Sequence, residues 1–248
     1  MNTKLLIKLL REMAEEATIY AEDALRDMAD AIEEVTAGQA AAGGDPEATQ
    51  DGPTEWINKR PVIIGVGHSR PGDDGALSAD GTTEWRWNKT VAHLLLHKLR
   101  EAGVNCQVVD AYGERESYAA AVKWVSKFLR TANALAIVEL HFNAYDGDAL
   151  GFETLHWHTS AQGKLLAGHI HKELQVFVGA ADLATKDRGV KARDQGSRGW
   201  RMLRDTPCAC VLTEPFFGDN ETEWGFWKDK QAALAEVYCR GIYNWLRA

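Results

Sequence analysis

Hydrophobic and polar residues alternate along residues 60–248 in two different periodicities. Short apolar runs of strand length occur at 61–66, 104–109, 134–141, 152–157, 200–204 and 208–214. Longer segments, in which apolar residues recur every three to four positions, separate these runs at 84–102, 114–132, 160–177 and 226–247. Threonine at 82 or 83 can cap the first of these helices, and Gly103 ends it. This alternation predicts an open α/β sheet of about six strands with helices on both faces.

The first 36 residues follow a different pattern. Apolar side chains from Ile7 to Val35 recur at alternating steps of three and four, and the span contains neither Gly nor Pro. It predicts a long amphipathic, coiled-coil-like helix. A single helix of this kind cannot bury its own row of apolar side chains. Its partner is therefore the rest of this chain, a second copy of the chain, or another protein. Residues 37–59 have the composition of a linker, and 60–248 are expected to form the main folded domain.

The distribution of charge narrows the classes of partner. The chain has a net charge of −8, and residues 1–52 hold 12 of the 36 acidic and 4 of the 28 basic side chains, so the remainder is balanced. Residues 1–52 are acidic and the rest of the chain is neutral overall. This distribution argues against nucleic acid and anionic lipid as partners. No apolar run approaches the roughly 18 residues of a membrane span. Lys8 interrupts the apolar start, and no small-residue cleavage site follows, which indicates a helix and not a signal peptide.

Two histidines stand where apolar strands end. His68 follows the run 62–66 and Gly67, and His141 ends the run 134–140. The carboxyl ends of strands in an α/β sheet are where ligands collect. Glu84 begins the intervening helix, so its carboxylate can turn back toward this edge. Two imidazoles and one carboxylate form a ligand set that zinc often takes in hydrolases. The alternative for each residue is an ordinary core or surface position.

Two further carboxylates flank this predicted metal site. Glu214 ends the apolar run 208–214 and lies among apolar neighbours, which favours a raised pKa and a role as general base. An ion pair with Arg204 is the alternative. Glu139 lies two residues before His141, on the same side of its strand. It could orient a metal-binding histidine, or form an ion pair at the edge of the sheet.

The motifs occur in an order that resembles a known family across about residues 60–247. They are Gly67-His68, Glu84, His141-Phe142-Asn143-Ala144, Asp187-Arg188-Gly189-Val190-Lys191, Leu203-Arg204-Asp205-Thr206-Pro207 and Val211-Leu212-Thr213-Glu214. Together they resemble the zinc-dependent N-acetylmuramoyl-L-alanine amidases of the amidase-3 (autolysin-like) family. The resemblance implies a mostly parallel central sheet with flanking helices. It also implies hydrolysis of the amide between N-acetylmuramic acid and L-alanine in peptidoglycan.

The resemblance implies roles for individual residues. His68, Glu84 and His141 would bind one catalytic Zn²⁺, and Glu214 would be the catalytic carboxylate. Side chains expected to contact substrate, with loop structure as the alternative, are Asn143, Arg188 and Arg204. Two departures from the family pattern are Ser69 after the first histidine and the segment 215–220 after the catalytic carboxylate. The segment 215–220 resembles a variant found in phage endolysins. An endolysin would be made in the host cytoplasm and would reach the wall through a holin-type membrane lesion.

Other functions remain open from the sequence. A zinc peptidoglycan peptidase or carboxypeptidase would use similar ligands but release amino acids or cross-link fragments. A glycosidase would pair Glu214 with Glu139 or Glu153 and release reducing sugar ends. A non-catalytic protein would bind the cell wall without turnover, with the helix over 1–36 as its interface.

Overall fold

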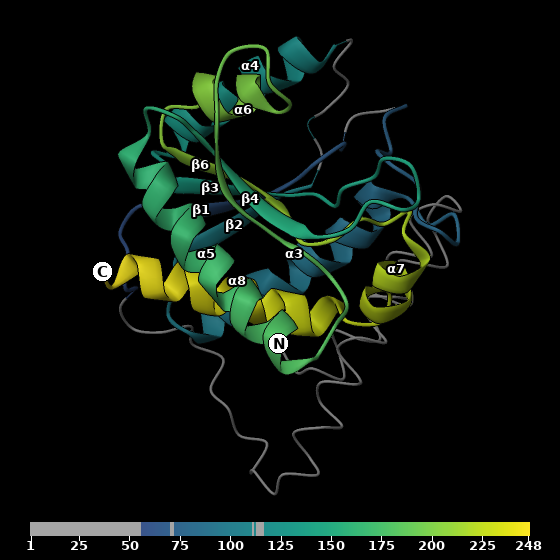
Figure 1. The fold of residues 1–248 in the computed structure, drawn as a ribbon. Coiled ribbons are helices and arrows are strands. Elements are labelled where there is room, and N and C mark those ends of the chain that lie inside the picture. Colours follow the sequence, from purple (N-terminus) through teal and green to yellow (C-terminus); the bar gives the residue numbers. More distant parts are fainter. Residues whose placement is uncertain (1–55, 70–71, 111, 113–116) are drawn as a thin grey trace, which may run out of the picture. The chain divides into compact units, whose positions relative to one another are not determined.

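The computed structural model describes residues 56–69, 72–110, 112 and 117–248, and Glu55–Ala248 form one compact unit (Figure 1). The predicted helix over 1–36, its expected self-association and the linker up to residue 55 lie outside the described residues. The end of the expected linker contacts the domain. The Ile57 backbone N–H donates to the Gly103 carbonyl at 2.8 Å, and Asn58 Nδ2 donates to the Asn105 carbonyl at 2.9 Å.

A six-stranded sheet forms the centre, in the order β2-β1-β3-β6-β4-β5. The strands are β1 (Val62–Val66), β2 (Cys106–Val109), β3 (Ala136–Leu140), β4 (Phe152–Trp157), β5 (Asp187–Arg193) and β6 (Ala209–Glu214). The first four strands in the sheet are parallel, while β4 pairs antiparallel with β6 and β5 runs parallel to β4. The expected α/β class and mostly parallel sheet are therefore confirmed.

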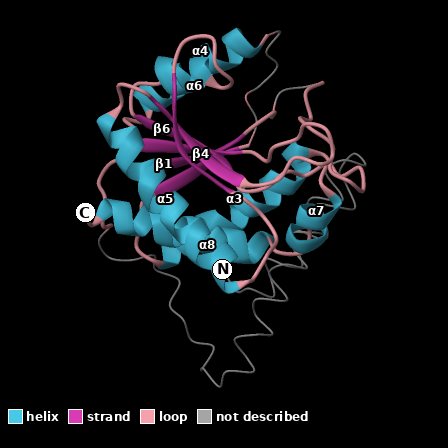
Figure 2. Ribbon diagram, viewed as in Figure 1, coloured by secondary structure: helices cyan, strands magenta, loops and turns pink. Residues whose placement is uncertain are grey.

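Helices cover both faces of the sheet (Figure 2). One layer holds α3 (Glu84–Glu101), α5 (Ala161–Ala180) and α8 (Gln231–Leu246), and the other holds α4 (Tyr118–Thr131) and α6 (Trp200–Asp205). Each layer buries its own apolar cluster against the sheet. The short helix α7 (Glu221–Trp227) precedes α8. No helix among the described residues is both long and apolar enough to cross a membrane.

The predicted strand over 200–204 is wrong, because this segment is helix α6. Gly199 precedes it in the left-handed region, with φ 73°, and turns the chain into the helix. The neighbouring side chains of Met202 and Leu203 are both buried, which a half-buried strand with alternating faces does not allow. The sixth strand is instead β5, which lies at the edge of the sheet and carries mostly polar, partly exposed residues. It therefore lacks the apolar run of a central strand.

The register of the central strands brings three chain segments to one edge. Val66 pairs with Leu140, and Leu140 pairs with Thr213, so β1, β3 and β6 end together. Each is buried along its whole length, as expected for parallel strands covered on both faces. The residues that follow these strands, including His68 and His141, therefore meet at the carboxyl edge of the sheet.

An aromatic cluster supports the loops that leave this edge. Phe142, directly after His141, and Phe216, two residues after Glu214, have ring centroids 5.3 Å apart. The ring of Trp87 on α3 lies 5.1 Å from Phe216 in an edge-to-face arrangement, which is a favourable aromatic geometry. The apolar packing thus fixes the backbone beside both predicted site residues.

Candidate metal centre

The two histidines and Glu84 reach the carboxyl edge of the sheet from three different elements. His68 follows β1 and has a left-handed backbone, with φ 58°, which is uncommon outside glycine. Its preceding residue is tied to the neighbouring strand, because the Gly67 N–H donates to the Leu140 carbonyl at 3.0 Å. Glu84 is the first residue of α3, whose capping side chain is Thr83, one of the two predicted. His141 directly follows β3.

These three side chains converge as the sequence predicted. One possible ligand atom from each of His68, Glu84 and His141 lies within 4.8 Å of the others. Glu84 Oε1 lies 2.9 Å from His141 Nδ1, and Glu84 Oε2 lies 3.5 Å from His68 Nε2. Backbone N–H groups of Phe142 and Ala76 also donate to the two oxygens of Glu84. The carboxylate is thereby held in one orientation between the imidazoles.

Two glycines leave room for this arrangement. A Cβ on residue 67 would lie 2.1 Å from His141 Cε1, inside the imidazole ring's contact distance. A Cβ on Gly75 would lie 2.7 Å from Glu84 Oε2 and 2.9 Å from His68 Cγ, and Gly75 also has a φ of +77°. Both positions therefore require glycine for the three side chains to meet.

Glu84 and His141 form a charged pair, and the pKa of each is shifted accordingly. Burial alone raises the pKa of Glu84, but the hydrogen bond and charge of His141, together with the charge of His68, hold it below its usual value. Burial alone lowers the pKa of His141, but the neighbouring carboxylates of Glu139 and Glu84 raise it well above its usual value. A cation binding here therefore has to displace a proton from His141.

Glu139 is buried beside His141. Its Oε2 lies 3.3 Å from His141 Nε2, a nitrogen that has no hydrogen-bond partner among the described residues. The other oxygen, Oε1, accepts a 2.5 Å hydrogen bond from the hydroxyl of Tyr112. The carboxylate is thus oriented toward the imidazole by a buried tyrosine, a contact that no sequence pattern indicated.

Glu214 ends β6 and is 2% exposed. Burial, opposed by the charges of His141 and Arg198 and reinforced by those of Glu84 and Glu153, raises its pKa to about 7. Its Oε2 is buried without a hydrogen-bond partner. A carboxyl group with these properties can accept and return a proton near neutral pH. The alternative contact with Arg204 does not form; the nearby arginine is Arg198, whose Nη2 lies 3.7 Å from Glu214 Oε1.

Arg198 also contacts the predicted substrate residue Asn143. Its Nη1 donates to Asn143 Oδ1 at 2.7 Å, and Asn143 Nδ2 donates to Glu153 Oε1 at 3.3 Å. About half of the Arg198 side chain is exposed, so its remaining donors face solvent beside Glu214. Sequence reasoning missed Arg198, which lies in the irregular segment between β5 and α6, where no periodic pattern marks it.

Glu153 is the last residue in the chain of contacts that runs from Glu214 through Arg198 and Asn143. It lies directly opposite Glu214 across the β4–β6 pair. Three cations from β5 surround it: Arg188 Nε at 3.1 Å, Lys191 Nζ at 2.5 Å and Arg193 Nη2 at 3.5 Å. Arg188, a predicted substrate residue, also packs over the ring of Phe217 at 5.0 Å. The ion pair between Arg188 and Glu153 joins β5 to β4.

The remaining predicted residue, Arg204, is placed elsewhere. It lies on α6, where its Nε contacts Asp205 Oδ1 at 2.5 Å and its guanidinium lies 4.3 Å from the Trp200 ring centroid. The structure thus does not bring Arg204 into the group around Glu214. Tyr145, two residues after Asn143, is 81% exposed. Its backbone N–H donates to Asp219 Oδ2 at 2.8 Å, which fixes the loop.

The described residues fit a catalytic zinc ion. Two imidazoles and one carboxylate are a donor set that suits Zn²⁺ and leaves a coordination position open. His141 Nδ1 faces the Glu84 carboxylate at 2.9 Å, and the glycines at 67 and 75 keep the space around the three side chains free of Cβ atoms. The group of His68, Glu84 and His141 could therefore hold a metal ion.

A comparison with known protein families found one match. The sequence profile of the amidase-3 family, described as N-acetylmuramoyl-L-alanine amidase, matches residues 62–244. No curated protein sequence matches the chain.

Solved structures of amidases share the fold. The CwlD amidase from Clostridioides difficile, in complex with the GerS lipoprotein, is 25% identical with a TM-score of 0.63, over 75% of this chain and 98% of that chain. The amidase AmiC2 of Nostoc punctiforme is 21% identical with a TM-score of 0.63, over 76% and 98%. The catalytic domain of the CD27L endolysin targeting Clostridia difficile is 24% identical with a TM-score of 0.62, over 75% and 97%.

The profile match covers most of the chain, including every residue of the metal-binding group and Glu214. The chain therefore belongs to the amidase-3 family of N-acetylmuramoyl-L-alanine amidases, enzymes that hydrolyse the amide between sugar and peptide in peptidoglycan.

Proposed function

We propose that the domain over 60–248 is a zinc amidase in which His68, Glu84 and His141 bind the metal and Glu214 transfers protons. The convergence of these three side chains at the edge of the sheet that also carries the buried Glu214 is the observation that carries the proposal. When bound, zinc supplies Lewis acidity that lowers the pKa of water to roughly 7 and polarises a carbonyl. The amide in the substrate is unactivated, so both effects are needed.

Glu214 has the properties of the proton carrier. In its ionised form it accepts a proton from the attacking water, and in its protonated form it returns the proton to the amine of L-alanine as the bond breaks. A pKa of about 7 makes both forms accessible near neutral pH. Glu139, buried against His141 and fixed by Tyr112, orients the imidazole for metal binding.

Substrate contacts are assigned to the exposed groups beside Glu214. Arg198 donates to Asn143 and still has guanidinium donors facing solvent, so it can bind the carbonyl oxygen as negative charge develops there. Asn143 positions Arg198 and is itself held by Glu153. The exposed ring of Tyr145 offers a stacking surface for a sugar of the glycan. Arg188 acts indirectly in this scheme, through its ion pair with Glu153.

Peptidoglycan digestion followed by mass spectrometry tests the proposal. Zinc-loaded protein should create new L-alanine amino termini without new reducing sugar ends. Chelated protein should lose this activity, and Glu214→Gln should lower the rate by about 10²–10⁴-fold, as expected for loss of a proton-transfer group. Glu101→Gln, at an exposed position on α3, is the matched control and should retain the rate.

Each alternative function gives a different result in the same experiment. Reducing ends that survive chelation would identify a glycosidase. Both oxygens of Glu153 are already engaged by Asn143 and cations, which disfavours that function. Released amino acids or cross-link fragments would identify a peptidase, and binding without any product would identify a wall-binding protein.

We further propose that the chain serves as a phage endolysin. The segment over 215–220 and the similarity to an endolysin catalytic domain support this role. The protein would be made in the host cytoplasm and reach the wall through a holin-type lesion, with residues 1–36 mediating self-association or contact with a partner helix. Expression in a bacterial cytoplasm should cause lysis only when a membrane-permeabilising protein is co-expressed. Lysis without that protein would contradict the proposed route.

A further inference from the structure

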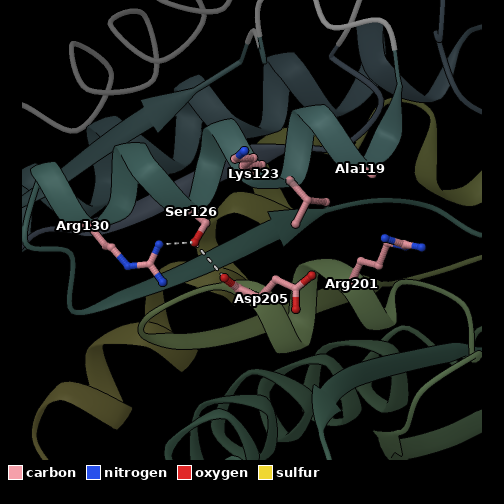
Figure 3. Close-up of a pocket in the computed structure, with 7 residues that line it drawn as sticks. Ala119, Lys123, Ser126, Arg130, Arg201 and Asp205 are labelled. Carbon is pink, nitrogen blue, oxygen red and sulfur yellow. Dashed lines mark hydrogen bonds between the residues drawn. The ribbon is translucent and has the colours of Figure 1, made fainter.

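A second polar pocket lies between helices α4 and α6, on the face of the sheet opposite α3, α5 and α8 (Figure 3). Its volume is about 290 Å³, close to the lower limit for small-molecule sites. The lining residues are Ala119, Val122, Lys123, Ser126, Arg130, Arg201 and Asp205. None of them belongs to the metal-binding group or to the network around Glu214.

The lining carries an excess of positive charge. Lys123, Arg130 and Arg201 form no ion pair with a carboxylate in the described part of the chain. Asp205 is the only acidic side chain in the lining, and its Oδ1 is already engaged by Arg204, which is not part of the pocket. Three cations and one carboxylate give the lining a net positive charge, which favours an anion over a cation there.

Two hydrogen bonds join three of the residues that line the pocket. The Ser126 hydroxyl donates to the Asp205 carbonyl at 2.7 Å and accepts from Arg130 Nη1 at 3.1 Å (Figure 3). Ser126 is buried, so Arg130 is oriented by a neutral group that leaves its charge uncompensated. At the other end of the pocket, the guanidinium of Arg201 lies 4.9 Å from the Trp200 ring centroid. Both arginines are therefore partly ordered before any ligand binds.

One chain segment joins this pocket to the candidate active site. Arg198 contacts Asn143 and Glu214, and three residues later Arg201 lines the pocket. A substrate of the proposed amidase extends beyond the scissile bond as a peptide, at roughly 3.3–3.6 Å per residue when extended. Carboxylates are the anionic groups that such a peptide presents, and arginine binds them with paired donors.

We propose that the pocket between α4 and α6 is an anion subsite for a carboxylate of the acidic peptide attached to the scissile amide. The proposal rests on the amidase function above and extends it to the substrate class: peptides with free carboxylates are preferred over their amidated counterparts. Lys123 and Arg201 attract the carboxylate. Arg130 binds it through the guanidinium N–H groups that do not donate to Ser126.

Paired soluble substrates test this preference. Zinc-loaded protein is assayed on two muramoyl peptides that differ only in whether the peptide carboxylates are free or amidated. Exposed charge pairs each contribute a factor of a few, so the wild type should show a KM about 10-fold lower for the free acid. The Lys123→Gln/Arg201→Gln double variant should lose this discrimination, with a KM ratio near one. Lys127→Gln removes an exposed cation on α4 outside the pocket and should keep it.

A binding measurement separates this proposal from the proposed function. A calorimetric titration of the zinc-loaded wild type with the acidic peptide alone should show binding. The double variant should bind the same peptide about 10-fold more weakly. If the wild type cleaves no muramoyl peptide but still binds the acid through these residues, the amidase function fails and the anion subsite remains. Equal KM ratios in wild type and double variant, or binding that responds only to inorganic phosphate or wall phosphopolymer, would overturn the peptide subsite.

Discussion

Replacing Glu214 with glutamine in the metal-free protein is expected to stabilise the fold increasingly as the pH rises. Burial, together with the neighbouring charges of Glu84 and Glu153, raises the pKa of this carboxyl from 4.5 to about 7 in the folded protein. The folded state therefore binds the proton more tightly than the unfolded state. This stabilising contribution is fully present below about pH 4.5 and is lost as the pH rises through about 7. Glutamine stays neutral at every pH and avoids that loss.

The size of the effect follows from the two pKa values. The difference between 4.5 and about 7 corresponds to roughly 3 kcal/mol in the free energy of unfolding. The advantage of Glu214→Gln over wild type should therefore grow from about 1 kcal/mol near pH 5 to about 3 kcal/mol near pH 8. Contacts between the new amide and Arg198 would change the free energy of unfolding by the same amount at every pH. The change of the difference between variant and wild type with pH is therefore the quantity to measure.

Urea unfolding of chelated protein at several pH values measures this difference. Glu101→Gln, which neutralises an exposed carboxylate on another element, is the control and should follow the wild type. In the zinc-loaded protein the same Glu214→Gln change should remove most of the activity. A difference between wild type and Glu214→Gln that stays flat between about pH 5 and 8 would refute the reasoning, because it would mean that Glu214 is not held in its neutral form by burial.

Three further predictions concern the metal-binding group. Zinc binding should release protons, because the pKa of His141 is raised in the metal-free protein; calorimetry in buffers with different ionisation enthalpies measures this, and identical heats would contradict it. Glu84→Gln should weaken zinc binding at least 10-fold in a chelator competition, and unchanged affinity would exclude Glu84 as a ligand. Gly75→Ala should lower zinc occupancy and activity because its Cβ meets Glu84 and His68, whereas Gly72→Ala, with the same φ of +77° and no atom within 4 Å, should lower stability alone. Equal zinc occupancy in the two alanine variants would contradict the steric argument.

The central strands and the metal-binding group could be predicted from the sequence for one physical reason. Parallel strands covered on both faces have to be apolar along their whole length, so β1 and β3 are visible as continuous runs. The histidines stand out because they interrupt those runs at the edge where strands end. Glu84 could be placed because Thr83 and the apolar periodicity mark where its helix begins.

Two of the segments that were missed, β5 and α6, lack such a signal. The strand β5 lies at the edge of the sheet and keeps polar side chains on both faces because they bind Glu153 and solvent. The six-residue helix α6 is too short for a helical period to be distinguished from alternation. The start of α7 did carry a signal: Asn220 caps it by accepting from Thr222 and Glu223, a residue type and position typical of a helix start.

The contacts of the arginines could not be predicted because they depend on tertiary structure. Arg188 and Arg204 occur in motifs and were natural candidates, yet one is bound by Glu153 and the other by Asp205. Arg198 lies just before the turn at Gly199 that begins α6, and the fold places it beside Glu214. Sequence order places these three residues within 17 positions of each other, and only the fold decides which one faces the site.

Anomalous X-ray diffraction from a zinc-soaked crystal at the zinc absorption edge tests the central claim most directly. We predict one strong peak per chain, about 2.0–2.2 Å from a ring nitrogen of His68, a ring nitrogen of His141 and a carboxylate oxygen of Glu84. Occupancy should disappear in the Glu84→Gln crystal and persist in the Glu101→Gln crystal. A peak bound by other residues, or no peak in a protein that still cleaves peptidoglycan, would contradict the account.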